Sequence, residues 1–229
     1  LTIGSMNKST ATAYDNVYGY GQGKTTTETV AGFDEFNVHV AGDKTKNSSL
    51  SSLHSTNNTL RKVTIDSKTG SDANLTIGNS NTVVATAFDN SADNAQAFKD
   101  VQIMDASTFA GNLTLNAGFT KEIVEKYLAN VEETTLYGLN NAAKELALFE
   151  YKGGKGDDTL NLALDLENIV EDNFTHATNT NGLNVFKMNI DGGAGNDTII
   201  VDADTAGDTA LTATNITING GAGNDIIDI

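Results

Sequence analysis

The chain has 229 residues, a net charge of −16 and a pI near 4.3. Its 14 Lys and Arg residues do not cluster, which argues against nucleic acid or an anionic membrane surface as a direct partner. Cys and Pro are both absent, so disulfides, zinc–thiolate sites and slow prolyl isomerisation are excluded. No run of eighteen apolar residues occurs, and we expect no membrane insertion.

Short apolar segments separated by turn residues predict an all-β chain. Such pieces suit a β-solenoid, either a parallel β-helix or a β-roll, better than a wide sandwich face, because each residue of a strand adds only about 3.3 Å. In chain order, we expect strands over residues 37–40, 63–65, 75–77, 83–88, 101–104, 113–115, 134–139, 146–151, 160–164, 185–190, 198–201, 216–218 and 226–229.

One segment predicts a short helix, over residues 121–131. Its apolar residues fall at three- and four-residue spacing, from Ile123 to Val131, and Thr120 can cap its start. We expect its apolar face to pack against the β-structure as a cap. A partner-binding amphipathic helix is the alternative.

Three segments read Gly-Gly-x-Gly-x-Asp and are each followed by a strand. They begin at Gly153, Gly192 and Gly220. Glycines allow tight turns that bring backbone carbonyls together, and calcium binds six to eight oxygen atoms. The pattern is the one that builds calcium-binding β-rolls. We therefore predict a Ca²⁺ cofactor, with metal-site residues at positions one, three, four and six of each segment: Gly153, Lys155, Gly156, Asp158, Gly192, Ala194, Gly195, Asp197, Gly220, Ala222, Gly223 and Asp225.

The spacing of the segments departs from a simple tandem array, since 39 residues separate the first two starts and 28 the last two. The loops can stack if each spacer makes whole turns, which would place the middle loop between the others. Asp157, at the variable fifth position, is expected to point to solvent. A weaker copy aligns residues 65–72 with residues 190–197, which would place Asp72 opposite Asp197. It is either a corner of the same coil geometry or a generic Asp/Ser/Gly turn, and we assign no metal there.

The C-terminal half resembles an RTX (repeats-in-toxin) β-roll. Residues 101–115 resemble a phrase of RTX-type surface-layer proteins of Gram-negative bacteria: an Asp-Ala-Ser turn, an apolar residue, a Gly and a Leu-Thr-Leu strand. The resemblance implies that each ion lies between two stacked loops. It also implies type I secretion, folding by calcium outside the cell and a crystalline layer on the cell surface.

Enzyme signatures are missing from the sequence. The residues His39, His54 and His176 are scattered, and neither His-Glu-x-x-His nor Gly-x-Ser-x-Gly occurs. The segment at Gly19–Thr25 is one residue short of a phosphate loop. We therefore expect a protein that is not an enzyme.

Two functions remain open. The first is a structural subunit of a calcium-dependent, self-assembling surface layer, whose partners are its own copies and, through regions outside this chain, envelope polysaccharide. The second is the repeat region of a secreted RTX adhesin or toxin. We expect a β-rich solenoid-like region at residues 1–150 and a calcium-binding β-roll at 151–229, together forming a fragment of a longer chain.

Overall fold

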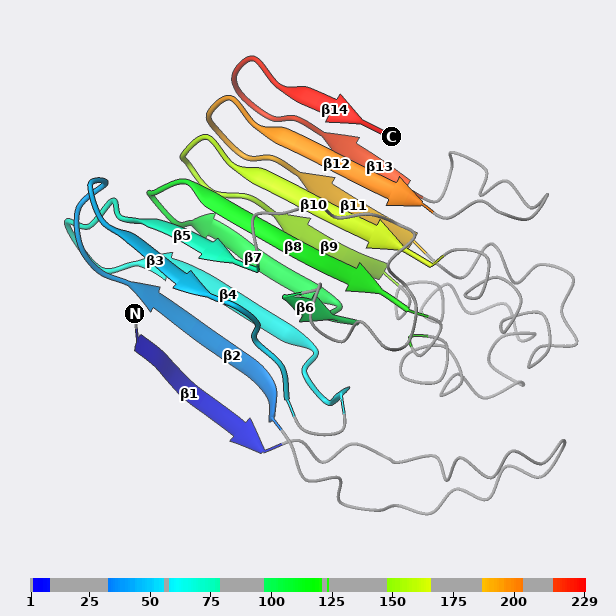
Figure 1. The fold of residues 1–229 in the computed structure, drawn as a ribbon, viewed down its shortest axis with the longest axis horizontal. Coiled ribbons are helices and arrows are strands. Elements are labelled where there is room, and N and C mark those ends of the chain that lie inside the picture. The colour runs from blue at the N-terminus through cyan, green and yellow to red at the C-terminus, as the bar shows by residue number, and fades with distance from the viewer. Residues whose placement is uncertain are drawn as a thin grey trace, which may run out of the picture.

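The computed structural model describes residues 2–8, 33–55, 58–78, 97–120, 123, 148–165, 187–203 and 216–229. Within these residues the chain is all-β and forms two sheets, one behind the other in the view of Figure 1. The helix expected over residues 121–131 lies outside the described residues except for Ile123, which is buried. The strands expected over 83–88 and 134–139 also lie outside them.

The first sheet has the strand order β1-β2-β4-β7-β9-β11-β13. All neighbouring strands in it are parallel except β1, which pairs antiparallel with β2. Its strands are β1 (Thr2–Lys8), β2 (Phe33–Val40), β4 (Lys62–Ser67), β7 (Ile103–Thr108), β9 (Leu148–Lys152), β11 (Lys187–Asp191) and β13 (Ile216–Asn219).

The second sheet is parallel throughout and has the order β14-β12-β10-β8-β5-β3, with the short strand β6 also pairing with β8. Its strands are β3 (Asn47–Leu50), β5 (Asn74–Ile77), β6 (Phe98–Lys99), β8 (Leu113–Phe119), β10 (Thr159–Leu164), β12 (Thr198–Ala203) and β14 (Ile226–Asp228).

From β2 onward, and apart from the short strand β6, successive strands alternate between the two sheets, so the described strands form six levels. Each level holds one strand of the first sheet and the next strand of the second. We call β2/β3, β4/β5 and β7/β8 the N-terminal levels, and β9/β10, β11/β12 and β13/β14 the C-terminal levels. Strand β9 spans residue 150 and pairs with β7 and β11, and β10 pairs with β8, so both sheets run without a break from the N-terminal to the C-terminal levels.

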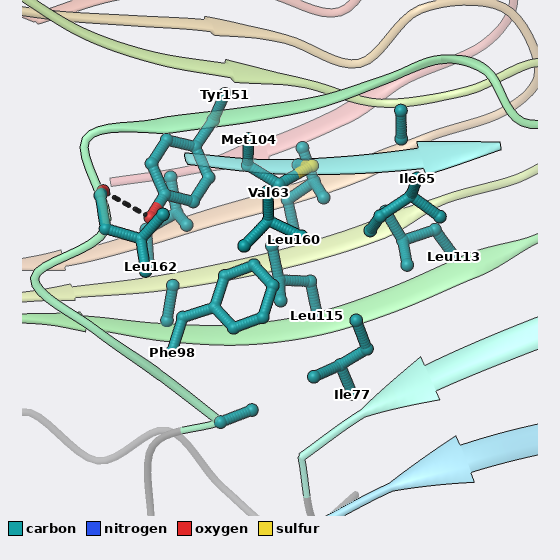
Figure 2. Close-up of a cluster of buried hydrophobic side chains, with 14 of the residues drawn as sticks. Val63, Ile65, Ile77, Phe98, Met104, Leu113, Leu115, Tyr151, Leu160 and Leu162 are labelled. Atoms are coloured by element: carbon teal, nitrogen blue, oxygen red, sulfur yellow. Dashed lines mark hydrogen bonds between the residues drawn. The ribbon is translucent and has the colours of Figure 1, made fainter. Parts of the chain in front are cut away.

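The core lies between the sheets, where alternate side chains of strands such as β4, β7 and β9 are buried. Figure 2 shows Val63, Met104 and Tyr151 from the first sheet facing Leu115 and Leu160 from the second. All five are almost completely buried. The Tyr151 hydroxyl donates a hydrogen bond to the Val101 carbonyl oxygen at 2.8 Å, which satisfies the one polar atom of that side chain.

Aromatic side chains fill this core at the third and fourth levels. The ring of Phe119 meets Phe149 and Tyr151 edge-on, with centroids 5.7 Å and 5.3 Å away. The core is therefore a narrow apolar layer that continues from one level to the next.

Most predicted strands are present with shifted ends, while β1, β3 and β6 were not predicted. The Asp-Ala-Ser turn expected at residues 105–107 is wrong, because these residues belong to β7. Asp105 points outward and accepts a hydrogen bond from the Ser107 N–H at 3.0 Å, whereas Ala106 is buried. The same alternation that builds the other strands therefore continues through this segment.

Candidate metal centre

The three Gly-Gly-x-Gly-x-Asp loops stack directly on one another. They connect β9 to β10, β11 to β12 and β13 to β14, and Figure 1 shows them side by side at one end of the sheets. Backbone hydrogen bonds join them: Ala194 N–H donates to the Gly154 carbonyl at 3.0 Å, and Ala222 N–H donates to the Gly193 carbonyl at 2.9 Å. The middle loop thus lies between the other two, as the sequence predicted.

Glycines are needed at the first position of each loop because the stack is so close. A Cβ on Gly192 would lie 2.6 Å from Asp197 Oδ2 and would also overlap the carbonyl oxygen of Gly220. Gly153 has the same relation to Asp158 and to the carbonyl of Gly192. The fourth position carries a second requirement in the middle loop, where Gly195 has a φ of +124° and packs on the carbonyl of Gly156.

The third position contributes backbone only. Lys155 is exposed, and Ala194 and Ala222 form an isolated parallel β-bridge with each other. The structure therefore brings together all twelve predicted residues in one stack, in which Asp158 and Asp197 are buried and Lys155 and Ala222 are exposed.

The position-six carboxylates form a ladder along the stack. Each accepts, at Oδ1, the backbone N–H of the corresponding residue one level earlier. Leu113 N–H donates to Asp158 at 2.7 Å, Asp158 N–H to Asp197 at 2.8 Å and Asp197 N–H to Asp225 at 3.0 Å. Asp158 and Asp197 are each only 1% exposed, so both carboxylates are shielded from water.

The second carboxylate oxygens differ between loops. Asp158 Oδ2 accepts a hydrogen bond from the Gly154 N–H. Asp197 Oδ2 is buried and has no hydrogen-bond partner among the protein atoms. A buried carboxylate oxygen without a partner is costly, and it points to a ligand that the protein itself does not supply.

Burial also perturbs the titration of this ladder. It raises the pKa of Asp158 from 3.8 to about 7, although hydrogen bonds from Gly154 and Leu113 act in the opposite direction. Burial is likewise the main cause that raises the pKa of Asp197, and the neighbouring charge of Asp225 raises it further. Both carboxylates therefore lack a compensating positive charge in the protein alone.

The donor set of this stack fits calcium. It offers carboxylate and backbone carbonyl oxygens on closely spaced loops, with no nitrogen or sulfur ligand, as a hard cation requires. No group of three or more His, Asp or Glu side chains gathers at one point in the described residues. Backbone carbonyls would therefore have to complete the coordination of any ion.

In the N-terminal levels, apolar residues occupy the backbone position that Asp158 and Asp197 hold in the C-terminal levels. This difference was not predicted from the sequence. The strand registers place Leu113 and Leu75 at the level positions of Asp158 and Asp197, and both leucines are buried. The expected match of Asp72 with Asp197 is therefore wrong in register by three residues, and Asp72 instead accepts a hydrogen bond from the Lys44 N–H at 2.9 Å. The signal was present in the repeated Leu-Thr-Ile and Leu-Thr-Leu strands, which align by their apolar residues.

A second ladder runs through position five of every level. It contains Asp157, which is exposed as expected but also accepts a hydrogen bond from the Asn196 N–H at 2.7 Å. At each step a side-chain oxygen accepts a hydrogen bond, at 2.7–3.2 Å, from a backbone or side-chain N–H of the corresponding residue in the next level. The residues are Asn47, Asn74, Asn112, Asp157, Asn196 and Asn224. It is the feature that both halves of the molecule share.

Comparison with known proteins gives no relative: no protein-family model matches the chain, and no curated protein or solved structure matches it. In the described residues, no helix is long and apolar enough to cross a membrane.

Proposed function

We propose that this chain is a calcium-dependent β-solenoid of the RTX type, and that it serves as a structural subunit of a self-assembling bacterial surface layer. The observation that carries the calcium proposal is the buried Asp197 Oδ2, which lacks a partner at the centre of three stacked Gly-Asp loops. The alternation of strands between two parallel sheets supports the solenoid.

The protein residues would act in two ways. Asp158, Asp197 and Asp225 would hold the ion with carbonyl oxygens of residues at positions one, three and four of the loops. When bound, calcium would supply the positive charge that these buried carboxylates lack. The glycines would keep adjacent loops near enough to share it, and the carboxylate ladder would fix their register.

The need of these carboxylates for calcium indicates the cellular compartment in which the chain folds. A stack of ionised, desolvated carboxylates is unfavourable where calcium is scarce, as it is inside a cell, and favourable at the millimolar calcium found outside. We propose that the chain is secreted, by a type I system, and folds on the surface of a Gram-negative bacterium. The alternative, an RTX adhesin or toxin repeat, shares the calcium chemistry but needs no lattice.

The test is a calcium titration of the whole chain, with bound calcium measured by isothermal calorimetry and assembly followed by electron microscopy. Asp197 lies between two loops, so Asp197→Ala should reduce the calcium stoichiometry more than Asp158→Ala or Asp225→Ala. Ordered sheets should form with calcium and not with magnesium, which requires a tighter octahedron. Equal losses from all three variants would contradict shared sites, and a protein that stays monomeric at millimolar calcium would favour the adhesin.

A further inference from the structure

The outer faces of the two sheets differ in chemistry. On the second sheet, the position-five row described above is followed two residues later by a row of small hydroxyl side chains. Strand registers align these hydroxyl residues from level to level: Ser49, Thr76, Thr114, Thr159 and Thr198. They are exposed or half-buried, and Asp157 is the one charged side chain in the two rows.

On the first sheet, by contrast, the outward positions carry charges that pair across strands. Lys62 lies 3.1 Å from Glu35, and His39 Nδ1 lies 2.6 Å from Asp66 Oδ1. Asp105 of β7 is the register partner of Lys152 on β9. These pairs satisfy one another within a single molecule.

An array of amides and hydroxyls is complementary to a copy of itself, because each such group both donates and accepts hydrogen bonds. A face of fixed charges is not self-complementary, because like charges oppose one another when two copies meet. In a chain with a net charge of −16, the approach of a second copy is therefore opposed least at these two rows, in which Asp157 is the one charged side chain.

We propose that this face, which we call the Asn/Thr face and define as the position-five row and the hydroxyl row of the second sheet, is where a second copy of the chain docks. The proposal rests on the self-assembly proposed above and names the surface that carries it. At the C-terminal edge the hydroxyl row ends in Ile226, which is 62% exposed and adds apolar area to the contact.

The size of the face predicts a weak contact. Six strands about 4.8 Å apart and two rows of side chains cover roughly 400 Å² per copy. This is about half of what a standard stable interface buries on each partner. Such a contact forms and breaks readily in solution and becomes effective where many copies are held side by side.

The experiment introduces one charge on each outer face. Thr159→Glu places a carboxylate in the hydroxyl row of β10, and the matched control Asn189→Glu places one on β11 of the first sheet, where the side chain is exposed. Association in calcium is measured by sedimentation velocity, with circular dichroism as a check on folding. We expect at least about tenfold weaker association for Thr159→Glu, since like charges then face each other across the contact, and no change for Asn189→Glu.

A second measurement introduces no new charge and so does not require the fold to accommodate one. The chain contains no Cys, so Thr159→Cys and Asn189→Cys each introduce a single thiol. A short bifunctional maleimide should cross-link copies in calcium through residue 159 and not through residue 189. Equal weakening by both Glu variants, or cross-linking through residue 189 alone, would overturn the Asn/Thr face while leaving self-assembly intact. A wild-type chain that never associates would instead overturn the surface-layer proposal.

Discussion

The N-terminal and C-terminal levels of this molecule share one backbone path, but they differ in the residue type that is buried where each second-sheet strand begins. Where Leu75 and Leu113 are buried in the N-terminal levels, Asp158 and Asp197 are buried in the C-terminal ones. A buried leucine stabilises the fold in water with or without calcium, by about 1.5–3 kcal/mol. A buried carboxylate stabilises it only with a compensating partner. The same architecture can thus be permanent in one half and conditional in the other.

The junction between the halves is direct. Asp158 is the first acidic rung, and its Oδ1 accepts the N–H of Leu113, the last apolar one. The N-terminal levels therefore present a formed edge on which the first Gly-Asp loop can stack. We expect the C-terminal levels to fold onto this edge once calcium is present.

We expect the largest effect when an aspartate replaces a buried leucine in an N-terminal level. Leu113→Asp would bury a charge among apolar side chains without the glycine pair that precedes Asp158. We expect a loss of more than about 4 kcal/mol in the free energy of unfolding, with or without calcium. Leu113→Met is the control, with a loss below about 1.5 kcal/mol. Chemical denaturation gives both values, and a tolerated aspartate would show that the levels are interchangeable.

The converse change removes a charge from the ladder of position-six carboxylates in the C-terminal levels. Asp197→Asn keeps an oxygen to accept the Asp158 N–H but can no longer supply a carboxylate. Without calcium the variant should be more stable than the wild type, because the pKa of Asp197 is raised by burial and its ionised form is disfavoured. With calcium at a hundredfold excess it should forgo about 2.7 kcal/mol for each site lost.

Thermal unfolding with and without chelator measures both effects of Asp197→Asn. Asp228→Asn removes the same charge from an exposed position of β14 and should show neither effect. A variant that is less stable than the wild type in both conditions would indicate that the Asp197 carboxylate is needed for packing alone.

A smaller effect separates loop contact from loop conformation. Gly192→Ala would place a Cβ against Asp197 Oδ2 and the Gly220 carbonyl, so we expect a loss of about 2 kcal/mol confined to the C-terminal levels. Gly70→Ala, at a φ of +77° with no atom near the new Cβ, should cost only about 1 kcal/mol through its backbone conformation. If the two variants unfold at the same denaturant concentration, close stacking is not what the first glycine provides.

The pH dependence of the calcium-free chain tests the desolvation of the Asp158 carboxylate in the C-terminal levels. The pKa of Asp158 is raised from 3.8 to about 7, so its contribution is fully present below about pH 4 and is lost as the pH rises through 7. In chelator, the melting temperature of the C-terminal levels should therefore be higher at pH 5 than at pH 8. Asp158→Asn should remove much of this difference. A melting temperature that rises with pH would contradict the desolvation of this carboxylate.

Prediction from sequence worked best where local chemistry decides the outcome. The Gly-Asp loops fix their own turns, and the motif predicted their stacking on the condition that each spacer makes whole turns. The position-five ladder was not foreseen, because one Asn in each level is informative only when the levels are stacked. The alignment of Asp72 with Asp197 failed for a related reason: the buried apolar residue Leu75, rather than the acidic one, sets the register of the stacked strands.

The Asp-Ala-Ser segment shows a further limit. Asp and Ser favour turns by hydrogen bonding to nearby backbone, and the Asp105 carboxylate does bond to the Ser107 N–H. The strand nonetheless continues, because Ala106 and Met104 are buried between the sheets and β9 pairs alongside. Tertiary packing overrides the local preference here, and no single segment of sequence contains that information.

Hydrogen exchange of the whole chain, with calcium and with chelator, tests most directly whether the C-terminal levels depend on calcium. With calcium, we predict protected amides in β4, β5, β7 and β8 and equally in β10 and β12. In chelator, protection should persist in the first group and fall in the second, since the C-terminal levels stack the buried carboxylates of Asp158 and Asp197, and burial raises the pKa of both. Equal protection of both groups in chelator, or equal loss from both, would contradict a division of the molecule into a permanent and a calcium-dependent half.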